Sequence, residues 1–153
     1  MVNDQYEIQQ PTSQFFATQL ITQEWAEPTD AEHRLFLASS DAKDSQGRVL
    51  VTAYALLRPD GQWSLMFINK DHDHSHQVRI AFHDADSNRD SFFAGPVTRI
   101  TFGEEQYPWH GARKKGHADP DGPAATSKLS GEENTQYNLP AASLTILRGR
   151  LRF

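Results

Sequence analysis

The chain has 153 residues, with 15 basic and 20 acidic side chains, a formal net charge of −5 and no cysteine. This length suits one domain, the acidic balance argues against a nucleic-acid partner, and the lack of cysteine excludes disulfides and thiolate metal ligands. No stretch reaches the ~18 apolar residues of a membrane span and no signal peptide is visible, so the sequence predicts a soluble domain.

The first predicted element is a helix over residues 12–25. Thr12 or Ser13 offers a hydroxyl that can cap its first turn. Pro28 and Asp30 end the pattern. The apolar residues of this segment fall on one stripe, which consists of Phe16, Leu20, Ile21 and Trp25. We expect this stripe either to fold onto the rest of the chain or to face a partner, because large apolar patches rarely stay exposed.

After Pro28 the apolar period changes from helical to two, which is typical of strands. The turn Pro59-Asp60-Gly61 joins two of these strands into a hairpin, and both faces of the pair are apolar, which predicts a central position in a sheet. Arginine at every second position of the last strand predicts a charged sheet edge. The predicted strands cover residues 33–39, 49–57, 62–69, 78–82, 97–102 and 143–151.

Between Gly103 and Asn138 the periodicity disappears, which predicts a long loop over residues 103–138. Many short strands separated by turns indicate an all-β fold, an antiparallel β-sandwich of about 7–9 strands with one N-terminal α-helix. We divide the chain into an N-terminal segment with the helix, residues 1–31, and the sandwich, residues 32–153.

Carboxylates are the first candidates for chemistry, because a glycosidase of the usual kind needs two carboxyl groups roughly 5–10 Å apart. Glu104 and Glu105 are adjacent at the end of a predicted strand. Neighbours in an extended chain point to opposite faces, so they are poorly arranged as a pair. The simpler interpretation is solvated loop charge.

The turn that holds His72, His74 and His76 is a candidate metal site, because alternate histidines on an extended chain can share a face and imidazole binds zinc, copper or nickel. The same turn does not fit a calcium loop, since the positions of the required glycine and glutamate hold His76 and Phe82. A polar hairpin turn explains the residues equally well, so we assign no metal and no cofactor.

Aromatic residues outside the periodic segments are candidates for carbohydrate binding. Sugars present C–H faces that stack on rings, and Tyr107, Trp109 and His110 lie in the predicted loop beside charged residues. Trp63 is in phase with Leu65 and is expected in the core. The alternative for Trp109 is that it closes the end of the sandwich.

Several runs of the sequence resemble a known protein family. Near the start these are Tyr6-x-Ile8-x-Gln10-Pro11-Thr12 and Leu20-x-Thr22-Gln23-Glu24-Trp25, and in the middle Arg58-Pro59-Asp60-Gly61-Gln62-Trp63-Ser64-Leu65-Met66. Gln106-Tyr107-x-Trp109-His110 and Leu139-Pro140-x-x-Ser143-Leu144 follow. Together they resemble the last barrel helix and the C-terminal β-sandwich of bacterial glycoside hydrolases of the β-xylosidase (family 39) and arabinofuranosidase-like type.

The resemblance implies a non-catalytic role. In such families the catalytic glutamates lie on earlier barrel strands, so no catalytic residue is carried over to this sequence. We expect an accessory sandwich that supports a catalytic barrel or binds a polysaccharide or oligosaccharide. The helix stripe would contact the barrel or a second copy of the chain. The alternatives are a small glycoside hydrolase that uses Glu104 or Glu105, and a metal-binding module.

Overall fold

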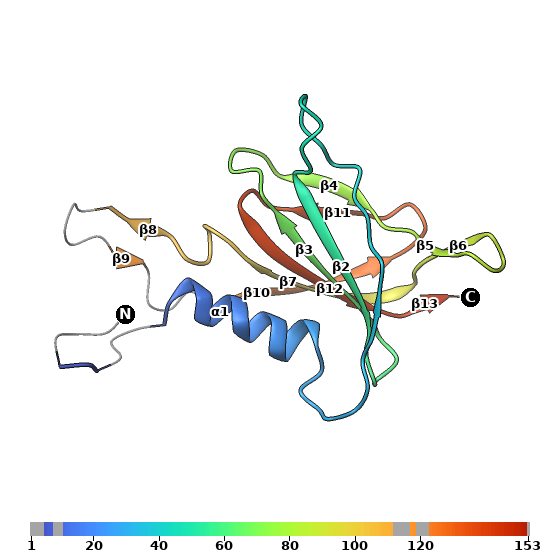
Figure 1. The fold of residues 1–153 in the computed structure, drawn as a ribbon, viewed down its shortest axis with the longest axis horizontal. Coiled ribbons are helices and arrows are strands. Elements are labelled where there is room, and N and C mark those ends of the chain that lie inside the picture. Colours follow the sequence, from blue (N-terminus) through green and yellow to red (C-terminus); the bar gives the residue numbers. More distant parts are fainter. Residues whose placement is uncertain (1–4, 8–10, 112–116, 119–122, 153) are drawn as a thin grey trace.

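The computed structural model of the chain describes residues 5–7, 11–111, 117–118 and 123–152. Two consecutive helical segments are followed by strands (Figure 1). In chain order the elements are α1 (Ser13–Gln19), the π-helical η1 (Leu20–Trp25), β1 (Arg34–Phe36), β2 (Val51–Leu57), β3 (Trp63–Asn69), β4 (His76–Arg79), β5 (Phe82–Asp84), β6 (Arg89–Phe93), β7 (Gly95–Phe102), β8 (Trp109–His110), β9 (His117–Ala118), β10 (Ala125–Gly131), β11 (Gln136–Leu139), β12 (Ser143–Gly149) and β13 (Leu151–Arg152).

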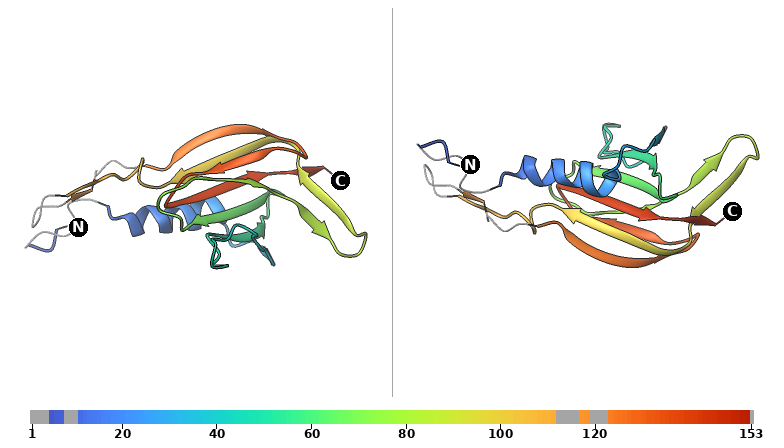
Figure 2. Two further views of the ribbon diagram at one scale, coloured as in Figure 1. Left: turned by 90° about the horizontal axis from the view of Figure 1, so that it is seen from above. Right: turned by 90° about the horizontal axis from the view of Figure 1, so that it is seen from below.

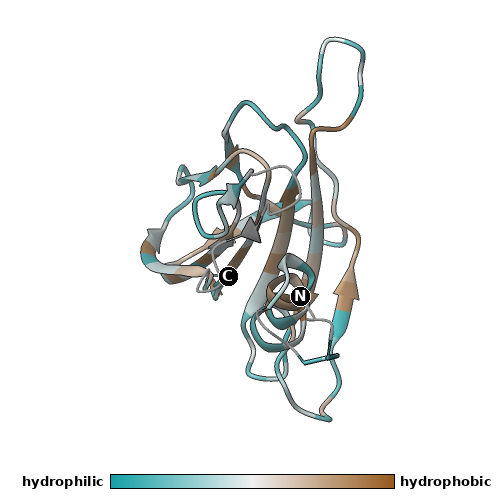
Figure 3. Ribbon diagram, turned by 90° about the vertical axis from the view of Figure 1, so that its left-hand side faces the viewer, coloured by the Kyte–Doolittle hydropathy of each residue, from teal (hydrophilic) through white to brown (hydrophobic). Residues whose placement is uncertain are grey.

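The main sheet has six antiparallel strands in the order β1-β2-β3-β12-β7-β10. The pair β11-β4 and the small sheet β13-β6-β5 lie over one face of it. The layers are visible in Figure 2, and apolar residues concentrate in the strands (Figure 3). The predicted class, an antiparallel β-sandwich with an N-terminal helix, is confirmed.

Two apolar clusters hold these layers together. Between the sheets, Leu65, Phe67 and Leu147 of the main sheet pack with Phe93 of β6 and Tyr137 of β11. Because successive side chains of a strand point to opposite faces, the neighbouring residues of these strands lie on the other face of the main sheet, where the helix packs. The second cluster consists of Phe16, Leu20, Met66, Ile100, Phe102 and Ile146.

The predicted hairpin is present as β2 and β3, paired from Val51 with Asn69 to Leu57 with Trp63. β3 is buried over most of its length, as expected for a strand covered on both faces. The first predicted strand is present in shortened form as β1. Leu35 of β1 and the following Leu37 are exposed.

The prediction of one long loop over residues 103–138 is wrong. β10 lies within it and pairs with β7 along seven residues, and β11 pairs with β4. β10 is an edge strand with one exposed face, so its sequence is mostly polar. Gly131 ends it close to the core, where an added Cβ would lie 2.8 Å from the Cβ of Phe93. This crowding explains a small residue where the sequence pattern expects an apolar one.

The predicted C-terminal strand is divided into two, and only its last part lies at a sheet edge: β13, which carries the exposed Arg152, is an outer strand of the small sheet β13-β6-β5. β12 lies inside the main sheet, between β3 and β7. Residues 83–90, which lie outside the predicted strands, contain most of β5 and the start of β6. None of the helical segments in the described residues has the length and apolar character that crossing a bilayer requires.

Candidate functional site

The helix begins where Thr12 caps it: its side chain accepts a hydrogen bond from the backbone N–H of Phe15 at 3.4 Å. Phe16 and Leu20 are buried against the main sheet of this chain, so the sheet covers half of the apolar stripe. Trp25 is half-buried and its Nε1 donates to the carbonyl of Ser64 at 3.2 Å. Ile21 remains 37% exposed. The stripe thus packs in large part onto the main sheet of its own chain.

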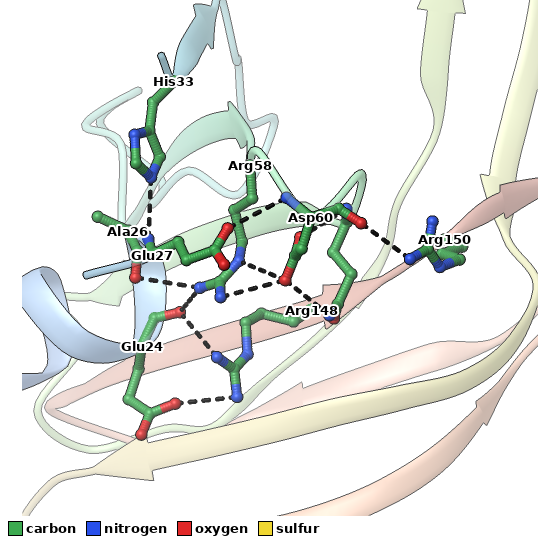
Figure 4. Close-up of polar contacts among 9 residues, drawn as sticks. Glu24, Ala26, Glu27, His33, Arg58, Asp60, Arg148 and Arg150 are labelled. Atoms are coloured by element: carbon green, nitrogen blue, oxygen red, sulfur yellow. Dashed lines mark hydrogen bonds and ion pairs between the residues drawn. The ribbon is translucent and has the colours of Figure 1, made fainter. Parts of the chain in front are cut away.

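Two arginines hold the C-terminal end of the helix (Figure 4). Arg58, which is only 7% exposed, donates through Nη1 to the carbonyls of Glu24 and Ala26 at 2.9 and 3.0 Å. The last carbonyls of a helix lack partners within the helix, so the guanidinium satisfies groups that would otherwise be unpaired. Arg148 of β12 donates to the same Glu24 carbonyl and forms an ion pair with the Glu24 carboxylate at 2.9 Å.

Asp60 connects this network to the turn after β2. Its carboxylate accepts from Arg58 and from the backbone N–H of Gln62. Burial raises the pKa of Asp60, but these hydrogen bonds outweigh it and the pKa is lowered. Burial also lowers the pKa of the Arg148 guanidinium, against the opposing effect of the Glu24 carboxylate. The carbonyl of Asp60 accepts from Arg150 at 2.8 Å.

The aromatic candidates lie at the other end of the helix. After β7 the chain turns through residues 103–107, with the N–H of Tyr107 donating to the carbonyl of Gly103 at 3.0 Å. The Tyr107 ring packs against Phe16 and Phe102, at 5.7 Å between ring centroids in both pairs. Its hydroxyl donates to the carbonyl of Pro11 at 3.0 Å. Tyr107 therefore anchors the start of the helix to the sandwich.

Trp109 lies beside this anchor on β8 and is 64% exposed. It lines an open groove of about 610 Å³, which we call the Trp109 groove. β8 and β9 project from the sandwich at this end (Figure 1). The residues that line the groove are Ser13, Gln14, Ala17, His72, Phe102, Gly103, Glu104, Tyr107, Trp109, Ala142 and Leu144.

The structure brings Tyr107 and Trp109 together but not His110. His110 is the next residue on β8 and does not line the Trp109 groove. Successive side chains of a strand point to opposite faces, which accounts for the separation. His110 pairs with His117 across β8 and β9.

The adjacent glutamates line different hollows. Glu104 lines the Trp109 groove, and Glu105 lines a second hollow on the other side of the same turn. In the described part of the chain, Glu104 is the one carboxylate that lines the Trp109 groove. A paired-carboxylate site is therefore not formed by these two residues.

The histidine turn is organised around Asp71. The Asp71 carboxylate accepts from the backbone N–H groups of Asp73 and His74 at 3.0 and 3.1 Å. It also contacts His74 Nδ1 at 3.3 Å and His76 Nε2 at 3.1 Å. These contacts, the Asp73 N–H first among them, lower the pKa of Asp71 to about 2. His72 lines the Trp109 groove instead. Over the described residues, no three metal-ligating side chains converge on one point.

Comparison with known proteins finds similarities of structure but none of sequence family. No family profile matches the chain, and no curated protein matches it. Among solved structures, the chain is similar to the GH51 α-L-arabinofuranosidase of Thermotoga petrophila RKU-1, at 10% identity and a TM-score of 0.44 over 67% of this chain and 19% of that one.

Two further enzymes give comparable values. A GH30 endoxylanase from Clostridium papyrosolvens C71 is similar at 14% identity and a TM-score of 0.44, over 77% of this chain and 23% of that one. Cel44A, a family 44 endoglucanase from Clostridium thermocellum, is similar at 11% identity and a TM-score of 0.42, over 66% and 17%. The chain spans about a fifth of the length of these structures. Their families are not family 39, so that finer resemblance stays a prediction.

Sequence reasoning missed part of the groove. Ser13, Gln14 and Ala17 of α1 form one wall, although they lie about ninety residues from Trp109 in the sequence. The signal available was the polar side of the predicted helix, opposite the apolar stripe. Nothing in the sequence indicated which loop would face it.

Proposed function

We propose that this chain is a non-catalytic accessory β-sandwich of glycoside hydrolase type that binds carbohydrate in the Trp109 groove. The observation that carries the proposal is the 64% exposure of Trp109 at the rim of an open groove of about 610 Å³. Large aromatic side chains usually bury most of their surface. An indole that stays exposed at the rim of a groove is therefore a candidate for contact with a ligand.

The chemistry of the groove suits a sugar. The apolar face of a pyranose or furanose ring can stack on the Trp109 indole, while its hydroxyls need hydrogen-bond partners nearby. Gln14, His72 and Glu104 line the same groove and supply such groups. Concave sites that combine a ring surface with a few polar side chains are typical of small-molecule binding.

The carboxylates favour binding without hydrolysis. A glycosidase of the usual kind places two carboxyl groups on either side of the scissile bond. Within the described residues the Trp109 groove offers Glu104 alone, because Glu105 lines the hollow beyond the turn. The resemblance of the sequence to the sandwich of β-xylosidase-like enzymes points the same way, since the catalytic glutamates of that family lie on barrel strands.

Affinity electrophoresis tests the proposal. The purified chain is run through gels that contain xylan, arabinan or β-glucan, beside the variants Trp109→Ala and Tyr54→Ala. Tyr54 is a matched control, because it is 46% exposed and does not line the groove. We expect at least one polysaccharide to retard the parent and Tyr54→Ala but not Trp109→Ala. Equal mobility of all three chains in every gel would contradict carbohydrate binding.

Structural support of a catalytic barrel is a second candidate function. The observation that favours it is an exposed apolar edge of the main sheet, where Leu35 is 72% exposed and Leu37 fully so. β1 ends the sheet on that side, and exposed edges usually have a cover. Sedimentation velocity of the chain mixed with a β-xylosidase-type barrel tests it. We expect a 1:1 complex that the double variant Leu35→Ser, Leu37→Ser loses, whereas two independent species would contradict it.

A further inference from the structure

A second groove lies beside the Trp109 groove, and we call it the Arg99 groove. Its volume is about 410 Å³, which is enough for a sugar ring and within the range of small-molecule sites, roughly 300–1,000 Å³. β7, β10 and β11 all contribute residues to it. The residues that line it are Ser75, Arg99, Thr101, Glu105, Gln106, Ala125, Thr126, Ser127, Asn138, Pro140 and Ala141.

The two grooves share one ridge. Gly103 and Glu104 line the Trp109 groove, whereas Glu105 and Gln106 of the same turn line the Arg99 groove. Ala142 and its neighbour Ala141 are divided between the grooves in the same way. The two parts of the ridge touch, since a Cβ on Gly103 would lie 3.3 Å from the carbonyl oxygen of Ala142. The two grooves are therefore neighbours on the surface, separated by this ridge.

Arg99 sets the charge of the second groove. It is the one lysine or arginine among the described residues that line either groove. Its Nε donates to Ser127 Oγ at 3.2 Å, which fixes the plane of the guanidinium. No described carboxylate forms an ion pair with it. A half-buried guanidinium without an anionic partner is suited to a planar carboxylate, which it binds through two parallel hydrogen bonds.

The neighbouring amides add further donors. The Oδ1 of Asn138 already accepts from Gln77 at 2.9 Å, and the Oε1 of Gln106 accepts from the N–H of Gly103 at 3.1 Å. Each amide group is left to donate through its NH2. Glu105 supplies a carboxylate acceptor, and a sugar hydroxyl can donate to it. Arg99 and the two amide groups therefore supply donors for a ligand that carries acceptors.

We propose that the Arg99 groove binds a uronic acid, a sugar whose carboxylate pairs with Arg99 while its hydroxyls bind Asn138, Gln106 and Glu105. This deepens the proposed function, because it makes the ligand an oligosaccharide with a carboxylated residue that spans both grooves. The net charge of the chain is −5, so a general attraction to anionic polymers is excluded. If the chain binds the carboxylated sugar more tightly than the neutral one, the difference must therefore come from a local site such as Arg99.

The test compares two small probes that differ in one group. Backbone amide resonances are followed by NMR while methyl β-glucuronide or methyl β-glucoside is added to the parent, and acetate is the third arm. We expect the glucuronide to shift the amides that line the Arg99 groove at concentrations at least about tenfold lower than the glucoside or acetate, the effect of one charge-assisted pair. Arg99→Gln should abolish this difference, whereas Arg89→Gln, the same change at an exposed arginine of β6, should keep it.

The outcomes separate the two proposals. Equal shifts with glucuronide and glucoside, or equal shifts with glucuronide and acetate, would overturn the uronic-acid site. So would a glucuronide response that survives in Arg99→Gln. If polysaccharides retard the chain but the glucuronide shifts nothing at the Arg99 groove, carbohydrate binding stands and the uronic-acid site falls. If the glucuronide binds at the Arg99 groove and no polysaccharide retards the chain, the uronic-acid site stands and polysaccharide binding in the Trp109 groove falls.

Discussion

The two ends of the helix are held to the sandwich in different ways. At the C-terminal end, the buried Arg58 and the half-buried Arg148 satisfy the last carbonyls and pair with carboxylates. At the N-terminal end, the Tyr107 ring anchors the first turn and the neighbouring Trp109 remains exposed. The C-terminal end of the helix therefore contributes stability through polar contacts, whereas the N-terminal end leaves the Trp109 ring accessible beside a groove.

The largest effect is expected at the C-terminal end. Arg58→Ala removes the buried donor of the Ala26 carbonyl, leaves the Glu24 carbonyl with Arg148 alone and takes the arginine from the Asp60 carboxylate, and breaking such contacts typically costs about 3–5 kcal/mol. Urea unfolding measures the change. The matched control is Arg48→Ala, whose ion pair with Asp44 has a 74% exposed arginine and contributes at most about 1 kcal/mol. Similar small losses in both variants would contradict a structural role for the Arg58 network.

The next effect concerns the apolar stripe between the two ends. Leu20 is 3% exposed and packs in the cluster beneath the helix, so Leu20→Ala is expected to cost about 2–5 kcal/mol. Ile21→Ala, one residue further on and 37% exposed, should cost clearly less. Thermal unfolding of the two variants shows whether the helix belongs to the fold of this chain. Equal, small losses would mean that it does not.

A smaller effect is expected from acid at the histidine turn. The pKa of Asp71 is lowered from 3.8 to about 2 in the folded chain, so the folded state disfavours the proton more than the unfolded state does. The resulting stabilisation is present above about pH 4 and is lost as the pH falls toward 2. The difference in unfolding free energy between the parent and Asp71→Asn should therefore be widest at neutral pH and narrow over that interval. A difference that stays constant between pH 6 and pH 2 would be at odds with it.

The smallest effect on stability is expected at the groove. Trp109→Ala removes an exposed ring outside both apolar clusters, so the free energy of unfolding should change by no more than about 0.5 kcal/mol. Denaturant unfolding beside Arg58→Ala gives the direct comparison. A loss as large as that of Leu20→Ala would show that Trp109 closes the sandwich instead of serving a ligand.

The sequence predicted the parts of the fold that repeat with a clear period. The stripe from Phe16 to Trp25 and the hairpin of β2 and β3 follow from apolar spacing and turn residues, and both are present. β10 was missed because its inward residues, Ser127 and Gly131 among them, are small or polar at a sheet edge. The pattern there carries little apolar signal.

The candidate site was predicted only in part. Trp109 was singled out because it falls outside the periodic segments, and the structure shows it exposed. Tyr107 was placed beside it, but its packing under the helix depends on a contact with Pro11 that no local pattern encodes. The Arg99 groove combines residues from separate parts of the chain, so it is defined by the topology of the sheets and not by spacing.

The most direct test of carbohydrate binding uses the indole N–H resonances of the three tryptophans. Trp25 and Trp63 are half-buried and serve as internal controls, and the variant Trp109→Phe assigns the third signal. The chain is titrated with xylohexaose, arabinohexaose and cellohexaose. We predict that at least one of them shifts the Trp109 signal in a saturable way while the other two signals stay fixed. No shift of the Trp109 signal with any of the three sugars would contradict the account.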